Sequence, residues 1–479
     1  MRDPSLNRMR HFGGFFATAL AAAAAPAADA ATPFVLDRFI ISGWVDPVVP
    51  PANFSTEYAR MRTAGLTALL GGFGATDPTA VRAQVAACAA AGLACIPSAC
   101  ETAAGPGPDG SCVATVGDVL GYQMYDEPTA DQFPALAEWA SSVAARAPGA
   151  LRFINLLPNY GPFADEAAYS SYVAAFVATV KPDVLCFDHY PQWGAPPASA
   201  ISPAGYLRNL ATVREQALAA TPPIRFLNFM NAMPCEPSES LRTPPRTASD
   251  PDRTHAHRCL CARADGSRPD VSEAQVRWQV YASLAHGSSG ILYFCWWSPG
   301  GATFQWGGAI MTPQSPVGNT SAVEYVEGPK YALVARVNEK LGAFGTFLLN
   351  ATSQFVFEAN GTGASNASVV PAGAAVAALG GSGAGSAWSV LLGGFSLRGA
   401  SSGTAFVLLN QDTVLPAVTS LVLGASAGTA CELDASGARI PLRDDAPAMP
   451  GLQLFLAEGD ARLLFFVPSG DCSGDAARP

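Results

Sequence analysis

Short apolar runs alternate with amphipathic stretches between residues 35 and 345. The apolar runs are 39–45, 67–72, 93–98, 119–125, 151–157, 183–188, 223–230 and 289–296. Helical periodicity lies between most of them, as in 131–147, where Phe133, Leu136 and Val143 fall on one side of a helix. Continuous apolar strands that alternate with helices predict a parallel sheet whose outer face is covered by the helices.

Eight such strands within about 310 residues predict a (β/α)8 TIM barrel over residues 31–345, an α/β fold. The alternative is an open doubly wound sheet, which would be expected to carry a glycine-rich phosphate loop after its first strand. The stretch FIISGWVDPVVPP has no such loop.

The pattern changes after residue 346. Short β-like runs occur at 353–358, 388–393, 404–410, 417–423, 439–442, 452–456 and 462–467. Frequent turn residues between short strands predict an antiparallel β-sandwich over 346–479, with the Gly/Ser/Ala tract 373–387 as a loop.

The first 30 residues have the pattern of a secretory signal peptide. Arg2, Arg8 and Arg10 precede an apolar stretch, and small residues follow at Ala28 and Ala30. No second apolar stretch of about 20 residues follows, so we expect a secreted protein without a membrane span after cleavage. Five Asn-x-Ser/Thr sequons agree with a secreted glycoprotein; they begin at Asn53, Asn319, Asn350, Asn360 and Asn366.

The charge and the cysteine content of the chain indicate which classes of protein it can belong to. The 479 residues carry a net charge of −10 and only three lysines, which argues against binding to nucleic acid. Eleven cysteines in a secreted chain predict disulfides. We expect Cys100 to pair with Cys112, and Cys235 to pair with Cys259 or Cys261 so that it closes an insertion at about 234–270. Nothing in the sequence predicts an oligomeric state.

The cluster His255, His257, Cys259 and Cys261 resembles a zinc site only in residue type. Paired ligands in structural zinc sites are spaced by two or more residues, so we predict no metal there and no cofactor elsewhere. No Gly-x-Ser-x-Gly elbow of the kind that carries a serine nucleophile, Walker loop or His-Glu-x-x-His motif stands out.

Acids, amides and large aromatic residues collect where the predicted strands end. In a parallel barrel these carboxyl ends form the active face. The candidates are Trp44, Asp46, Asp126, Glu127, Asn159, Asp188, His189, Tyr190, Asn231, Trp296 and Trp297. Two carboxyl groups beside aromatic rings and amides suit glycoside hydrolysis, which needs an acid for the leaving oxygen and a second carboxylate.

Glu127 is the predicted general acid. Like-charge repulsion from Asp126 would favour the protonated form that an acid catalyst needs. The alternative is structural, since an Asp-Glu pair before a helix is also a common N-terminal cap.

Four segments resemble secreted (β/α)8 glycoside hydrolases of the β-galactosidase and cellulase superfamily, clan A. They are GYQMYDEPTADQFPALAEW, FINLLPNYG, VKPDVLCFDHYPQW and VRWQVYASLAHGSSGILYFCWW, 64 residues in all. The resemblance implies that Glu127, in an Asp-Glu-Pro version of the Asn-Glu-Pro motif on strand four, is the acid/base. The nucleophile glutamate that the clan keeps on strand seven is missing from IRFLNFMNAMP, and the next acid is Glu236.

Either the predicted strand is misplaced, or Glu236 folds back to the strand end, or the second carboxyl comes from elsewhere, and Asp188 on strand six is then the best replacement. Strands four and six are separated by one strand, which would leave room for a water and would suit inversion. The predicted function is a secreted glycoside hydrolase acting on O-glycosidic bonds of an oligo- or polysaccharide. The alternatives are a catalytically inactive glycan-binding protein and a transglycosylase on the same barrel.

Overall fold

The computed structural model describes most of the chain after residue 33. The described residues are 34–44, 54–71, 77–100, 112–113, 119–232, 270–297, 310–313, 325–362, 368–369, 375–383, 387–397, 403–424, 428–445, 447, 452–467 and 472. The predicted signal peptide, Asp46 and residues 234–269 of the predicted insertion, with its histidines and cysteines, lie outside them.

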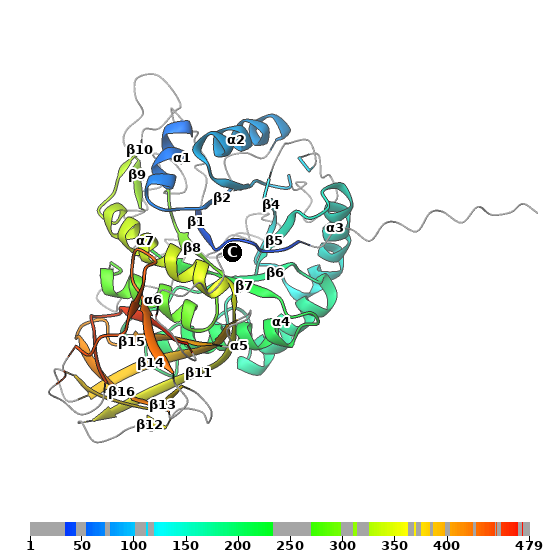
Figure 1. Cartoon of the computed structure of the whole chain (residues 1–479). Helices are drawn as coiled ribbons and strands as arrows, with labels where there is room; N and C mark the ends of the chain where they lie inside the picture. Colours follow the sequence, from blue (N-terminus) through cyan, green and yellow to red (C-terminus); the bar gives the residue numbers. More distant parts are fainter. Residues whose placement is uncertain are drawn as a thin grey trace, which may run out of the picture.

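Eight strands follow one another in the first part of the chain, at the positions predicted from the apolar runs. They are β1 (Ile40–Trp44), β2 (Ala68–Leu70), β3 (Ala94–Ile96), β4 (Gly121–Asp126), β5 (Leu151–Asn155), β6 (Val184–Asp188), β7 (Arg225–Asn231) and β8 (Gly290–Phe294). The helices are α1 (Phe54–Thr63), α2 (Pro78–Ala91), α3 (Phe133–Arg146), α4 (Glu166–Val180), α5 (Pro203–Ala219), α6 (Glu273–Ala285) and α7 (Tyr331–Leu349). Figure 1 shows these helices on the outside of the strands.

The strands are parallel, and each lies beside its neighbour in the chain. The ladders are β1-β8-β7-β6, β4-β5 and β2-β3. Single parallel bridges, Ser98 to Gln123 and Leu156 to Phe187, connect β3 with β4 and β5 with β6. The Thr67 N–H donates to the Ile41 carbonyl (2.8 Å) between β1 and β2. The neighbour relations therefore pass through all eight strands and return to β1.

Alternate residues of these strands belong to two separate apolar clusters. One cluster, which includes Ile40, Leu70, Phe153, Cys186 and Leu292, comes from the strands and the residues just beyond them. The other joins the opposite faces of the strands to the helices. Because side chains alternate along a strand, the last residues on the first face lie together at the carboxyl ends of the strands.

Two antiparallel sheets follow α7. The larger sheet has the order β11 (Ala351–Thr362), β14 (Ala387–Leu397), β15 (Thr404–Asn410), β20 (Ala461–Val467), β17 (Thr429–Leu433) and β18 (Arg439–Pro441). The smaller sheet has the order β12 (Ser368–Val369), β13 (Val376–Gly383), β16 (Ala417–Leu423) and β19 (Leu452–Leu456). Both sheets contribute to one apolar core, which includes Trp388, Phe406, Leu421 and Leu454.

The prediction of a loop over 373–387 is wrong for much of that tract. Strand β13 pairs with β16 from Val376 to Gly383. Glycine and alanine have weak strand propensity, but backbone hydrogen bonds to β16 and burial of Val376 and Leu379 outweigh it. Tertiary pairing therefore decides this strand.

The C-terminal sheets contact the helical layer through close backbone approaches (Figure 1). Gly393 on β14 lies so near α6 that a Cβ atom there would be 2.1 Å from the Ala285 carbonyl oxygen. The Arg225 guanidinium, at the start of β7, donates to the carbonyls of Leu349 (2.7 Å) and Ala351 (3.2 Å).

Two short strands, β9 (Met311–Pro313) and β10 (Tyr325–Glu327), pair with each other before α7.

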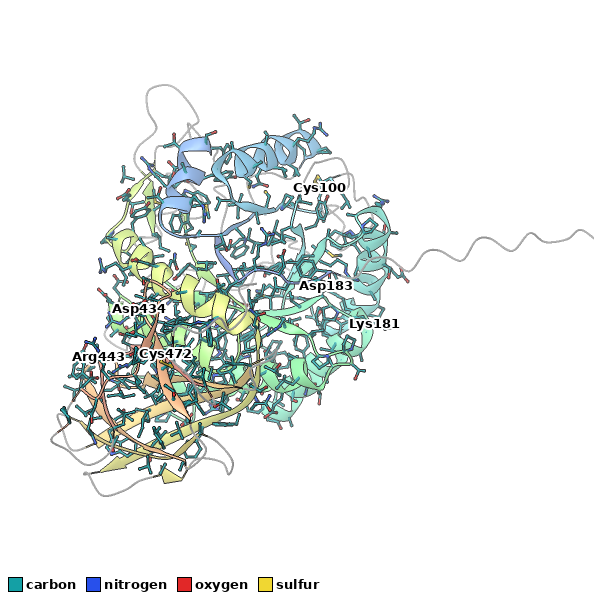
Figure 2. All side chains as sticks on the ribbon, in the orientation of Figure 1. Cys100, Lys181, Asp183, Asp434, Arg443 and Cys472 are labelled. Atoms are coloured by element: carbon teal, nitrogen blue, oxygen red, sulfur yellow. A yellow bond between two sulfur atoms is a disulfide. The ribbon has the colours of Figure 1, made fainter. Side chains whose placement is uncertain are left out.

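Two disulfides lie in the described residues. Cys100 pairs with Cys112, as predicted, and Cys431 on β17 pairs with Cys472, which follows β20 (Figure 2 labels Cys100 and Cys472). In the part of the chain that the structure describes, helices are too short or too polar to span a bilayer.

Candidate active site

An amide joins two carboxylates at the carboxyl ends of β4, β5 and β6. Asn155 ends β5, and its Nδ2 donates to Asp126 Oδ1 (3.0 Å) and to Asp188 Oδ1 (2.9 Å). Asp188 is 2% exposed, and Asp126 is half-buried. Because both oxygens bond to one nitrogen, they are less than about 6 Å apart. The two carboxylates thus share one amide donor at the strand ends.

Strand register and alternation bring these three side chains together. Asp126 and Asn155 are direct partners in the parallel ladder between β4 and β5. Leu151, Phe153 and Asn155 share one face of β5, and Leu156 bridges to the strand that ends at Asp188. Two apolar residues on that face therefore lead to a polar one where the strand ends.

Glu127 is held in an uncommon backbone conformation directly after β4. Its φ is +49°, in the left-handed region that costs a non-glycine residue about 1–2 kcal/mol. Its N–H donates to the Asn155 carbonyl (2.8 Å), and the Tyr172 hydroxyl donates to the next carbonyl, Pro128 O (2.6 Å). The neighbours of the Asp-Glu-Pro turn thus fix the backbone at Glu127.

The alternative interpretation of Asp126 and Glu127 as a helix cap is wrong. A 3-10 turn, η1 (Ala130–Gln132), precedes α3, and Thr129 caps it in a capping box with Gln132. The Thr129 N–H donates to Gln132 Oε1 (2.8 Å). The N-cap position thus lies two residues after Glu127, at Thr129.

Three negative charges act on one buried phenol. Burial raises the pKa of Tyr172 well above its usual range, and the charges of Glu127, Asp188 and Asp126 raise it further. Burial, followed by the charges of Asp188 and Asp126, likewise raises the pKa of the Cys186 thiol on β6. Both groups therefore stay protonated at neutral pH.

Aromatic rings lie on the same face of the strands. The Trp44 ring is 5.9 Å from the ring of Phe229 and 5.9 Å from that of Phe294, centroid to centroid. Tyr190 packs against Phe294 at 5.0 Å. Trp44 and Tyr190, both predicted site residues, are buried in this apolar layer at the strand ends.

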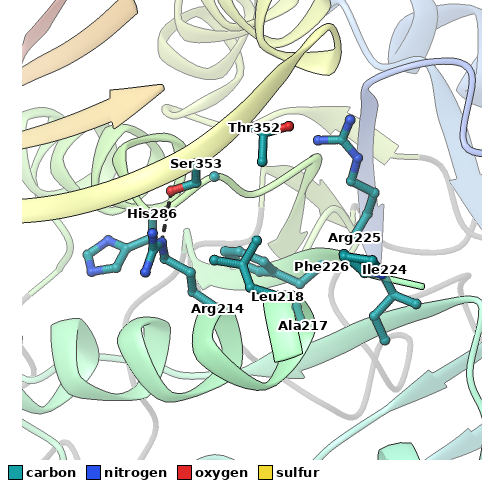
Figure 3. Close-up of a pocket in the computed structure, with 11 residues that line it drawn as sticks. Arg214, Ala217, Leu218, Ile224, Arg225, Phe226, His286, Thr352 and Ser353 are labelled. Carbon is teal, nitrogen blue, oxygen red and sulfur yellow. Dashed lines mark hydrogen bonds between the residues drawn. The ribbon is translucent and has the colours of Figure 1, made fainter. Parts of the chain in front are cut away.

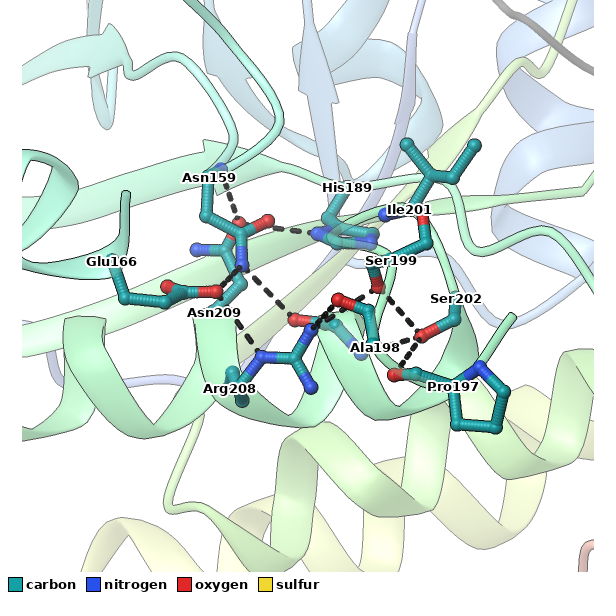
Figure 4. Close-up of polar contacts among 11 residues, drawn as sticks. Asn159, Glu166, His189, Pro197, Ala198, Ser199, Ile201, Ser202, Arg208 and Asn209 are labelled. Atoms are coloured by element: carbon teal, nitrogen blue, oxygen red, sulfur yellow. Dashed lines mark hydrogen bonds and ion pairs between the residues drawn. The ribbon is translucent and has the colours of Figure 1, made fainter. Parts of the chain in front are cut away.

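His189 and Asn159 lie on the opposite face, toward α5 (Figure 4). The His189 ring is fully buried between Tyr160 and Tyr206, and its Nδ1 lies 3.1 Å from Asn209 Oδ1. Burial lowers the pKa of His189 to about 3, so the ring is neutral at physiological pH. The same Asn209 oxygen accepts from the Asn159 N–H (2.8 Å). The structure does not bring these two residues to the Asn155 bridge.

Three other predicted residues are also enclosed. Asn231 ends β7, and its backbone N–H and carbonyl bond to the Gln279 side chain (2.9 and 3.0 Å). Trp296 and Trp297 are fully buried, and Trp297 Nε1 donates to Glu57 Oε2 (3.3 Å). Their rings are packed in the protein interior just after the end of β8.

A cavity of about 50 Å³ lies at the other end of the strands (Figure 3). Residues of α5, the start of β7 and β11 line it, and Arg214 Nε donates to Ser353 Oγ (2.8 Å) beside it. It begins near Arg225, at the amino end of β7, whereas Asn231 marks the carboxyl end of the same strand. This cavity is therefore separate from the carboxylates.

Among the residues that the structure describes, no three His, Cys, Asp or Glu side chains are grouped so that they could hold a metal ion.

Asn155 is a residue of this site that was not predicted from the sequence. It lies within the apolar run LRFINLL, where an amide at the end of a strand could have indicated a site residue. Its importance comes from Asp126 and Asp188, which are 29 and 33 residues away in the chain.

Comparison with known proteins gives distant likenesses only. Protein-family models do not match the chain, and neither do curated proteins. A family 42 β-galactosidase from G. stearothermophilus is 8% identical, with 90% of this chain and 98% of that chain covered and a TM-score of 0.46. A family 51 α-L-arabinofuranosidase from Bifidobacterium longum is 11% identical, with 92% and 97% covered and a TM-score of 0.42.

A family 5 glycoside hydrolase from Bacteroides vulgatus is 11% identical, with 92% and 91% covered and a TM-score of 0.41. These structural neighbours are glycoside hydrolases. TM-scores this low carry no argument about this chain, so its function has to be inferred from its own residues.

Proposed function

We propose that this chain is a glycoside hydrolase with a (β/α)8 catalytic barrel and a C-terminal β-sandwich. The return of the strand neighbour relations to β1 supports closure into a barrel. The shared apolar core of the two antiparallel sheets supports the sandwich. The predicted domain limits, 31–345 and 346–479, would divide α7, so we place the proposed boundary between α7 and β11, at Asn350. The disulfides Cys100–Cys112 and Cys431–Cys472 agree with secretion into an oxidising compartment.

The observation that carries the proposal is the Asn155 bridge between Asp126 and Asp188, with Glu127 adjacent. Burying the Asp188 carboxylate beside the half-buried Asp126 and a third acid is costly, and a purely structural site has no use for it. Carbohydrate hydrolysis does, because charge develops on the sugar ring and on the leaving oxygen.

Each acid has a separate role in this proposal. Glu127 protonates the leaving oxygen, and its backbone is fixed for that task by Asn155 and Tyr172. Asp188 is the second carboxylate, and Asn155 holds one of its oxygens so that the other keeps its orientation. If Asp188 activates a water the product anomer is inverted, whereas direct attack would give net retention, and NMR of the first-formed anomer distinguishes the two.

Substrate contacts are proposed on the same face. Asp126, which is half-buried, can accept bonds from sugar hydroxyl groups. The rings of Trp44 and Tyr190 are buried beside the site, so their role as sugar contacts stays a prediction. The other predicted contacts, Asp46, Asn159, His189, Asn231, Trp296 and Trp297, stay predictions.

Isosteric amides at the two acids test the proposal. We expect Glu127→Gln to lower turnover on a responsive glycoside by about 10²–10⁴-fold, the range for loss of an acid catalyst. Asp188→Asn should lower it comparably, since the amide oxygen still accepts from Asn155 and the fold is kept. Glu138→Gln, an exposed change on α3, is the matched control and should leave turnover unchanged. Wild-type turnover by both acid variants across a panel of polysaccharides and aryl-glycosides would contradict the proposal.

One observation favours the inactive glycan-binding alternative. Strand β7 ends at Asn231, and Arg225–Asn231 contains no acid. A glycan-binding protein would bind an oligosaccharide in calorimetry and release no reducing sugar. A transglycosylase would instead give longer acceptor products in a chromatogram.

A further inference from the structure

Two buried cysteines outside the candidate site lie closer than free thiols should. Cys88 on α2 and Cys95 on β3 have their Sγ atoms 2.7 Å apart. A disulfide bond is about 2.03–2.05 Å long. Non-bonded carbon atoms attract best at about 3.5–4.0 Å, and sulfur is larger than carbon. The observed separation is therefore too short for two thiols packed side by side.

The backbone around the pair brings the sulfur atoms together. Helix α2 ends at Gly92, whose φ is +69°. The Gly92 N–H donates to the Ala89 carbonyl (3.1 Å), and the Leu93 N–H donates to the Cys88 carbonyl (3.0 Å). This pair of bonds is a Schellman motif, which reverses the chain at a glycine. The reversal returns Cys95 along the last turn of the helix, so a local and well-defined turn sets the approach of the two side chains.

We propose that Cys88 and Cys95 form a disulfide in the secreted protein. The two thiols lose two protons and two electrons as the S–S bond forms. The oxidant is the disulfide of a thiol oxidoreductase, which is reduced to two thiols through a mixed disulfide with one of the cysteines. Both sulfur atoms are buried in the folded protein, so the exchange takes place before α2 and β3 finish packing.

The bridge would fasten the middle residue of a short strand to α2. Strand β3 has only three residues, Ala94–Ile96, and it pairs with the equally short β2. Cys100, four residues after β3, is already bonded to Cys112. One disulfide within β3 and another just after it would stabilise the part of the sheet that is built from its two shortest strands. This inference does not depend on the proposed function, since no carboxylate of the candidate site takes part.

Counting thiols tests the proposal by the sign of a change. The full-length protein is produced in an oxidising secretory host and unfolded without reductant in the presence of excess N-ethylmaleimide. Intact-mass spectrometry then gives the number of labels per chain. If the disulfide exists, Cys88→Ser frees Cys95 and the chain gains one label relative to wild type. If the two thiols are free, the same variant loses one label. Unfolding before labelling keeps the count valid even for a variant that folds poorly.

Control variants calibrate both directions. Cys100→Ser breaks a described disulfide and should gain one label. Cys186→Ser removes a free cysteine and should lose one. The double variant Cys88→Ser/Cys95→Ser should carry as many labels as wild type. Because it has no freed Cys95, its count stays valid even if Cys95 forms a new disulfide in the single variant Cys88→Ser. A double variant with two fewer labels would overturn the proposal.

Discussion

Replacement of Asn155 by alanine should separate the effect of the carboxylate bridge from that of an ordinary buried amide. Asn155 makes two hydrogen bonds to charged acceptors, Asp126 and Asp188. Bonds to charged groups contribute about 1.5–3 kcal/mol each, so Asn155→Ala should destabilise the protein by about 3–6 kcal/mol.

The matched control is Asn228→Ala on β7. Asn228 is equally buried, and its Nδ2 also makes two bonds, but to the neutral hydroxyls of Tyr206 (2.6 Å) and Ser283 (2.9 Å). Neutral bonds contribute about 0.5–1.5 kcal/mol each, which predicts a loss of about 1–3 kcal/mol. Because the same side chain is removed, the difference between the variants reports the charge of the acceptors.

The assay is denaturant unfolding followed by tryptophan fluorescence at pH 7. Turnover should fall in Asn155→Ala only. An Asn155→Ala deficit in unfolding free energy that is no larger than the Asn228→Ala deficit would refute the reasoning.

Two further predictions concern stability. Burial lowers the pKa of His189 from 6.5 to about 3, so its neutral form stabilises the fold fully above about pH 6.5, and on the order of 4 kcal/mol is lost as the pH falls toward 3. His189→Gln should therefore flatten the dependence of unfolding free energy on pH between 6.5 and 4, and an unchanged slope would contradict this. Gly393→Ala should lower the melting temperature, since its Cβ would press on the Ala285 carbonyl and overpacking costs about 1–3 kcal/mol. Gly342→Ala on α7, where the added Cβ meets no atom within 4 Å, should raise the melting temperature through about 0.5–1 kcal/mol of helix propensity. Equal shifts for both glycine variants in differential scanning calorimetry would exclude a close contact at Gly393.

The sequence was sufficient for features that depend on neighbours along the chain. The apolar runs located the eight strands because burial of both strand faces leaves a continuous apolar stretch. Alternation along a strand already places Asp188 and His189 on opposite faces, which the structure shows. The pairing of Cys100 with Cys112 follows from a short loop between two cysteines.

Contacts between distant segments needed the tertiary structure. The two acceptors of Asn155 come from β4 and β6, and the register of parallel strands, which sets those contacts, depends on how the whole ring of strands pairs. Cys431 and Cys472 are 41 residues apart, and β13 is a strand only because β16 lies beside it. Local sequence encodes which residues a strand buries, but the free energy that selects a partner is gained only when distant strands meet.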